Sequence, residues 1–248
     1  MPRASRLKSQ SGIYHIMLRG INQQVIFEDD EDYSKFIETL KNYKAISGYQ
    51  IFAYCLMSNH IHILLQTGQE DLDVIMKRIA GSYVYWYNWK YYRKGHLFQD
   101  RFKSEPIDDH AYFLTVMRYI HQNPLKAGIV DKIEQYEHCS YHEYADNKNG
   151  FIDKDFVYEI IDRDVLMEYL SEQNEDSCLD IEDLTFRLSD ADAMKEIKKI
   201  SGCENATEFQ LLEQSYRDKY ITMLKRQGLS IRQISRLTGM SFSLVRKL

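Results

Sequence analysis

The pattern of apolar and polar positions predicts strands in the first part of the chain. Residues 13–18 and 51–65 are apolar runs of strand length. The second run is interrupted by Ser58 and Asn59, which are residues typical of turns, so we expect two strands joined as a hairpin. Residues 95–107 predict a loop followed by a further short strand.

Apolar residues at helical spacing lie between these strands. Residues 30–47 show this spacing and are followed by Gly48, a residue typical of helix ends. Residues 72–92 predict a second helix, and residues 108–122 a third, which we expect Pro124 to end. Antiparallel strands with crossover helices on one face predict an α+β fold built on a ferredoxin-like antiparallel sheet.

The net charge of −5 conceals large differences in charge between segments of the chain. Residues 1–150 carry 18 basic and 18 acidic side chains, residues 151–213 carry 6 and 18, and residues 214–248 carry 8 and 1. Such asymmetry indicates segments with different partners, and the basic end is suited to contact phosphates. We therefore expect three parts: an N-terminal α+β domain, an acidic helical connector and an all-α tail, at residues 1–145, 146–200 and 201–248.

The tail has the pattern of a helix-turn-helix. Ser230 and Gln233 have the spacing of a capping box, Gly239 supplies a tight turn, and Ser241 can cap a second helix. This second helix would enter a major groove of duplex DNA. A three-helix module for protein contacts is the alternative. The basic residues expected to face outward and contact DNA are Arg232, Arg236, Arg246 and Lys247.

Bulk composition predicts a folded cytoplasmic protein. Hydrophobic residues make up 44% of the chain, yet no apolar stretch reaches the ~18 residues of a membrane span. The basic N-terminus lacks a following apolar segment, so it does not resemble a signal peptide. The four cysteines show no CxxC spacing, which favours reduced thiols over a zinc ribbon or a disulfide framework.

His60 and His62 flank Ile61 within the second apolar run. Side chains alternate along a strand, so both imidazoles are expected on one face, where they can bind one divalent ion. Ordinary buried histidines are the alternative. His15, in the first predicted strand, is expected either to pack in the core or to lie on the sheet face near this ion.

Tyr119 and Asn123 lie one turn apart on the third predicted helix. Asn123 could supply an amide oxygen as a third ligand beside the two imidazoles, a donor set that suits Mg²⁺ or Mn²⁺. Tyr119 could then attack a phosphodiester and become covalently linked to DNA. His121 is two positions from Tyr119 and is expected to face away.

These residues resemble those of a known family. The His60–His62 triplet, the 119–130 segment and the blocks at residues 56–64 and 95–103 are similar to the single-tyrosine HUH transposases, and most closely to the REP-associated tyrosine transposases. The resemblance implies an HUH endonuclease fold, metal at the two histidines, and cleavage of single-stranded, hairpin-containing DNA that leaves a 5′-phosphotyrosine at Tyr119. Many relatives have glutamine as the third ligand, so Asn123 follows the REP-associated pattern only.

The remaining candidates concern DNA binding. An aromatic cluster at residues 83–92 could pack on the sheet or stack on unpaired bases. Basic residues flanking the expected active-site loop are candidate phosphate contacts, namely Arg93, Lys94, Arg101 and Lys103. The partners are expected to be single-stranded or hairpin DNA and, through the tail, duplex DNA, with the protein a monomer or homodimer. Two alternatives stay open: a catalytically silent, sequence-specific DNA-binding regulator, and a module that binds RNA hairpins.

Overall fold

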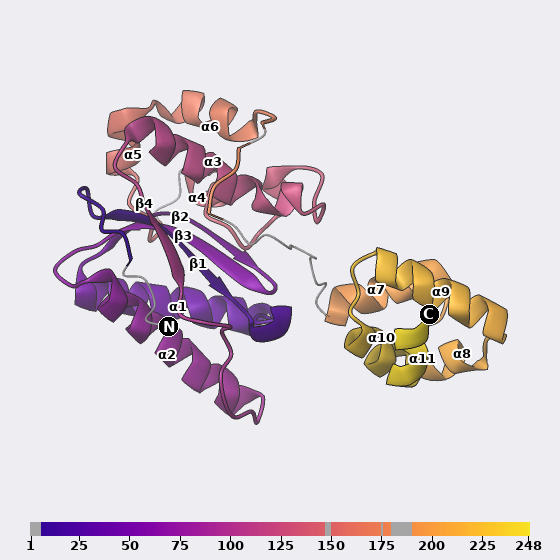
Figure 1. Ribbon diagram of the computed structural model, residues 1–248. Coiled ribbons are helices and arrows are strands. Elements are labelled where there is room, and N and C mark those ends of the chain that lie inside the picture. The colour runs from indigo at the N-terminus through magenta and orange to yellow at the C-terminus, as the bar shows by residue number, and fades with distance from the viewer. Residues whose placement is uncertain (1–5, 147–149, 175, 180–189) are drawn as a thin grey trace. The chain divides into compact units, whose positions relative to one another are not determined.

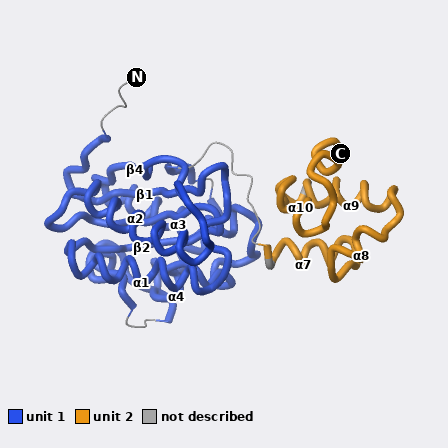
Figure 2. The backbone as a smooth tube through the Cα atoms, turned by 90° about the horizontal axis from the view of Figure 1, so that it is seen from below, with its two compact units in different colours: residues 1–184 blue, residues 185–248 orange. Residues whose placement is uncertain are grey.

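The computed structural model describes residues 6–146, 150–174, 176–179 and 190–248 (Figure 1). The chain forms two compact units, residues 1–184 and residues 185–248 (Figure 2). This division differs from the expected boundaries, because the expected connector at residues 146–200 is split between the two units. No described helix is both long and apolar enough to cross a membrane.

A four-stranded antiparallel sheet with the order β2-β3-β1-β4 organises the first unit. Its element order, β-α-β-β-α-β, is that of the ferredoxin-like motif, as the sequence predicted. The turn between the second and third strands of the chain is Ser58-Asn59, also as predicted. The strands are β1 (Ile13–Arg19), β2 (Gln50–Met57), β3 (His60–Gln66) and β4 (Lys103–Pro106).

The two crossover helices, α1 (Asp30–Ser47) and α2 (Leu72–Lys90), cover one face of the sheet (Figure 1). The bounds of α1 agree with the predicted range. A reciprocal capping box between Asp29 and Asp32 begins the helix, and Gly48, at φ +66°, ends it in a left-handed conformation that glycine adopts without strain.

Helix α3 (His110–Lys126) covers the opposite face of the sheet, so helices lie on both faces (Figure 1). Asp109 caps its N-terminus by accepting from two backbone N–H groups. The expectation that Pro124 ends this helix was wrong. Proline lacks only one backbone donor, and the helix continues around it, because the N–H of Ala127 still donates to the carbonyl of Asn123 at 2.9 Å. Asn123 is therefore buried inside the last turns of α3 instead of projecting from its end.

Short helices complete the first unit, and five helices make up the described part of the second, residues 190–248. In the first unit these are η1 (Ile21–Gln23), η2 (Ile133–Gln135), α4 (Tyr141–Ala145), α5 (Asp155–Ile160) and α6 (Arg163–Ser171). In the second they are α7 (Asp190–Ser201), α8 (Ala206–Leu211), α9 (Gln214–Arg226), α10 (Ile231–Thr238) and α11 (Phe242–Lys247). The second unit has its own apolar core, which includes Phe209, Ile234 and Val245.

Candidate active site

The strand register places both histidines of β3 on the face that α3 covers. His62 pairs with Met17 and His60 with Arg19 across the β1–β3 ladder, and paired residues share a face. Their ring centroids are 5.1 Å apart and the rings are nearly perpendicular. Both side chains are buried, so the predicted pair of convergent imidazoles is present.

The neighbours of His60 define which of its nitrogens can bind a cation. Its Nδ1 lies 2.7 Å from the side-chain oxygen of Asn59, which can only accept, so Nδ1 carries the proton. In the neutral ring the lone pair is then on Nε2, which lies 3.5 Å from Oδ1 of Asn123. The Asn123 amide is oriented by its nitrogen, which lies 3.4 Å from the carbonyl of Tyr119. Two acceptors that face each other fit a shared cation.

His62 offers a second lone pair. Its Nδ1 is 3.0 Å from Nε2 of His15, whereas its Nε2 is buried without a hydrogen-bond partner. Burial, followed by the nearby His60 and His15, holds the pKa of His62 well below its ordinary value. The ring is therefore neutral at physiological pH, which is the form that binds metal ions.

His15 lies on the site face and belongs to the cluster, which is the second of its two predicted placements. It is fully buried in β1, and its Nδ1 lies 3.7 Å from a carboxylate oxygen of Glu105 in β4. Glu105 also accepts a hydrogen bond from the hydroxyl of Tyr112 at 2.8 Å. Sequence spacing could not reveal this arrangement, because 47 residues separate His15 from His62.

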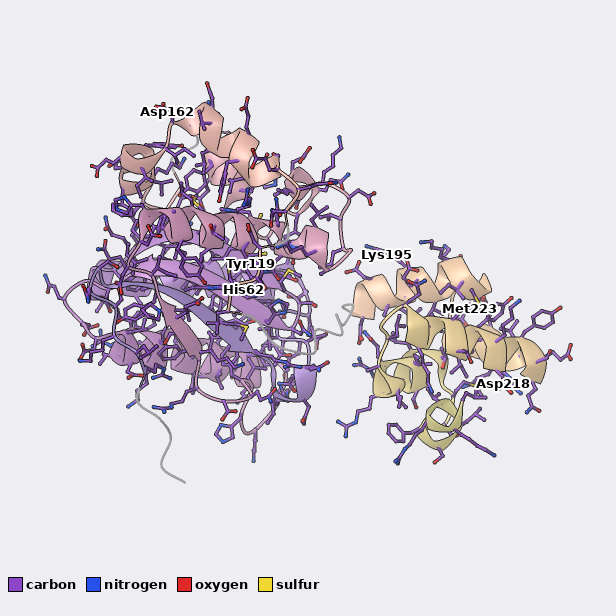
Figure 3. All side chains as sticks on the ribbon, turned by 45° about the horizontal axis from the view of Figure 1, so that its top comes forward. His62, Tyr119, Asp162, Lys195, Asp218 and Met223 are labelled. Carbon is purple, nitrogen blue, oxygen red and sulfur yellow. The ribbon has the colours of Figure 1, made fainter. Side chains whose placement is uncertain are left out.

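Tyr119 packs against the same cluster from α3. Its ring is 5.9 Å from that of His62 and 6.1 Å from that of His15, with edge-on geometry in both pairs. Figure 3 shows Tyr119 and His62 close together between the sheet and α3. The side chain is only 4% exposed, and Nζ of Lys126 lies 4.8 Å from the centre of its ring. The structure thus brings together all four residues predicted for the site: His60, His62, Tyr119 and Asn123.

His121 serves the packing of α3 and not the site, as expected. Its Nδ1 lies 2.8 Å from the carbonyl of Met117, and its Nε2 lies 2.7 Å from the hydroxyl of Ser140. Complete burial lowers the pKa of His121 to about 4. The ring is neutral, with both nitrogens occupied.

The predicted DNA contacts differ in their availability. Arg93 donates to the side-chain oxygen of Gln24 at 3.0 Å, and Arg236 forms an ion pair with Asp190. Arg236 is nevertheless exposed, as are the remaining candidates, namely Lys94, Arg101, Lys103, Arg232, Arg246 and Lys247. Arg19, which the sequence analysis missed, shares the site face and pairs directly with His60 in the sheet.

The aromatic cluster on α2 divides by face. Tyr83 and Tyr87 are buried and donate to the carbonyls of Ile26 and Val25, so their role is packing. Three rings of the cluster point to solvent, namely Tyr85, Trp89 and Tyr92.

Among the described residues, no group of three or more His, Cys, Asp or Glu side chains is arranged to hold a metal ion. The Asn123 amide oxygen faces His60 Nε2 and could serve as a third ligand beside the two imidazoles. The amide oxygen is a donor that Mg²⁺ and Mn²⁺ prefer, whereas imidazole nitrogens bind several divalent ions, zinc among them.

Comparison with known proteins assigns the region that contains this cluster. Residues 8–123 match the family described as "Transposase IS200 like". This segment is therefore similar to an IS200-like transposase domain. The matched range contains His60, His62 and Tyr119 and ends at Asn123.

Two relatives of this segment carry the same more specific name. A Haemophilus influenzae protein described as a REP-associated tyrosine transposase is 26% identical over 121 residues, which cover 44% of this chain and 66% of that protein. A solved structure of a REP-associated tyrosine transposase bound to a REP hairpin matches with a TM-score of 0.53 at 17% identity. That match covers 62% of this chain and 90% of the other, and it shows that the fold is shared.

Proposed function

We propose that this protein is a metal-dependent DNA endonuclease and strand transferase that acts on single-stranded, hairpin-containing DNA through Tyr119. The observation that carries this proposal is the buried cluster beside Tyr119, where His62 Nε2 lacks a hydrogen-bond partner and His60 Nε2 faces an amide oxygen. Buried polar atoms normally have partners, so such an arrangement favours a cation site. The REP hairpin bound by the structural relative supports the choice of substrate.

In the proposed reaction the Tyr119 oxygen attacks phosphorus in line with the leaving 3′-oxygen. The Tyr–O–P bond forms as the P–O3′ bond breaks; the phenol loses its proton and the 3′-oxygen gains one. The product is a 5′-phosphotyrosine and a free 3′-hydroxyl, and attack by a second 3′-hydroxyl reverses the step and joins two strands. A divalent ion, Mg²⁺ or Mn²⁺, held by His60, His62 and Asn123 would neutralise charge on the phosphate oxygens.

The decisive test is a covalent adduct between the protein and an end-labelled hairpin oligonucleotide on a denaturing gel. With Mn²⁺ or Mg²⁺ the parent is expected to form the adduct, and Tyr119→Phe is expected to bind the DNA without forming it. Tyr85→Phe, which alters an exposed tyrosine on α2, is the control and should retain the adduct. An adduct formed by Tyr119→Phe would refute the nucleophile assignment, and binding without cleavage by the parent would favour the silent regulator.

We also propose that α10 and α11 form a helix-turn-helix that binds duplex DNA. The supporting features are side-chain caps at Ser230 and Ser241 and the left-handed Gly239 between the helices, at φ +69°. We expect the double variant Arg246→Ala, Lys247→Ala to lose affinity for duplex DNA in a binding assay. Its cleavage of single strands should be unchanged.

A further inference from the structure

The contact between His15 and His62 has a chemical consequence for the site. A neutral imidazole carries one proton, and the nitrogen that carries it cannot bind a metal ion. For His62 the two choices are unequal, because Nδ1 faces another ring nitrogen at 3.0 Å whereas Nε2 is buried without a hydrogen-bond partner. The nitrogen that His15 presents to His62 therefore determines which atom of His62 is available.

Glu105 determines whether the His15 nitrogen that faces His62 is a hydrogen-bond donor or an acceptor. A carboxylate oxygen of Glu105 lies 3.7 Å from Nδ1 of His15, which is longer than a hydrogen bond but close enough for its charge to favour a proton there. Interaction with His15, and the hydrogen bond from Tyr112, hold the pKa of Glu105 below its ordinary value, so the carboxylate is ionised. When Nδ1 of His15 carries the proton, its Nε2 has a lone pair. That Nε2 then accepts a hydrogen bond from the Nδ1–H group of His62.

We propose that His15, backed by Glu105, is a positioning residue that fixes His62 as the Nδ1–H tautomer and so reserves His62 Nε2 for the metal ion. The two rings are tilted by 30° with centroids 5.2 Å apart, which suits an edge-to-edge hydrogen bond. Outer partners of this kind raise metal affinity by orienting the ligand and fixing its tautomer. This inference rests on the proposed function for the presence of a metal ion at the site.

Substitutions at His15 separate this role from simple packing. His15→Gln can still accept from His62 through its amide oxygen and donate toward Glu105 through its amide nitrogen, whereas His15→Leu can do neither. Met17→Leu is the matched control, since Met17 is buried two residues away on the same face of β1 and pairs with His62 in the sheet.

The first measurement needs no metal. In metal-free protein labelled with ¹⁵N-histidine, the ring nitrogen shifts are expected to show His62 protonated at Nδ1 in the parent, in Met17→Leu and in His15→Gln. In His15→Leu they are expected to show a shift of the proton to Nε2. An Nε2–H tautomer in the parent, or an unchanged tautomer in folded His15→Leu, would overturn the inference.

The second measurement is Mn²⁺ affinity, followed through the electron paramagnetic resonance signal of free Mn²⁺. We expect His15→Leu to raise the dissociation constant about 10- to 100-fold, and His15→Gln and Met17→Leu to leave it within about 3-fold of the parent. Equal weakening in His15→Gln and His15→Leu would overturn the positioning role. A parent that binds no Mn²⁺ while showing the expected tautomer would instead overturn the metal part of the proposed function.

Discussion

The two faces of the sheet differ in what they bury. Toward α1 and α2, β3 presents Ile61 and Ile63, both fully buried. Toward α3 the same strand presents His60 and His62, which are equally inaccessible. Burying apolar side chains stabilises a fold, whereas burying a ring nitrogen without a partner costs free energy. Ile61 and Ile63 therefore contribute stability, whereas burial of His60 and His62 gives up stability for a site.

Substitution of adjacent residues on the two faces should have opposite consequences. His62→Ala is expected to reduce the rate of hairpin cleavage by about 100- to 1,000-fold, because an electrostatic contribution to the transition state is lost. Its effect on the free energy of unfolding should be small, about 1 kcal/mol or less, because the loss of packing and of the hydrogen bond with His15 is offset by removal of a buried nitrogen without a partner. Cleavage by folded His62→Ala at the parent rate would contradict the assignment of the site.

Ile63→Ala should show the reverse behaviour. Truncation of a fully buried isoleucine is expected to lower the free energy of unfolding by about 2–4 kcal/mol, while the folded fraction cleaves at nearly the parent rate. Urea unfolding followed by tryptophan fluorescence measures this, because both tryptophans, Trp86 and Trp89, belong to α2 and report on the first unit alone. A loss of cleavage larger than the loss of folded protein would show that the two faces are not independent.

The contrast between the faces was readable from the sequence because it depends only on alternation along one strand. The positions of His60 and His62 on a common face follow from their spacing, and the bounds of α1 follow from its apolar period and from Gly48. His15 could not be assigned in this way. Its role depends on the register between β1 and β3, which is set by tertiary packing and not by local spacing.

The errors in the prediction have the same origin. Pro124 is a helix breaker by local rules, yet α3 continues for two more residues because packing and the remaining hydrogen bonds outweigh one lost donor. Arg236 faces outward as predicted, but its ion pair with Asp190, 46 residues earlier, was not predicted. Such long-range partners are invisible to periodicity.

Acid should destabilise the first unit through two buried histidines, His62 on the site face of the sheet and His121 on α3. In the unfolded chain histidine has a pKa of about 6.5, whereas burial lowers the pKa of His121 to about 4 and that of His62 well below its ordinary value. The unfolded state therefore binds more protons. The stability from these groups is fully present above pH ~6.5 and is lost as pH falls toward 4, by about 3 kcal/mol for His121. Urea midpoints measured from pH 7.5 to 4.5 should fall less steeply in His121→Gln than in the parent. Identical pH dependence in the two proteins would show that protonation of His121 is not a cause of the destabilisation.

The smallest expected effect concerns the charge at the rim of the site face. Arg19 pairs with His60 at the end of β1 and shares the site face, so we expect its guanidinium to contact a phosphate of DNA that enters the site. Arg19→Gln should weaken binding of single-stranded DNA and reduce the slope of log affinity against log salt by about 1. Lys35→Gln is the matched control, because Lys35 lies on α1, which covers the other face, and is paired with Glu38. Equal slopes for the two variants would mean that DNA does not approach along the site face. The buried histidines of that face would then have no demonstrated relation to substrate binding.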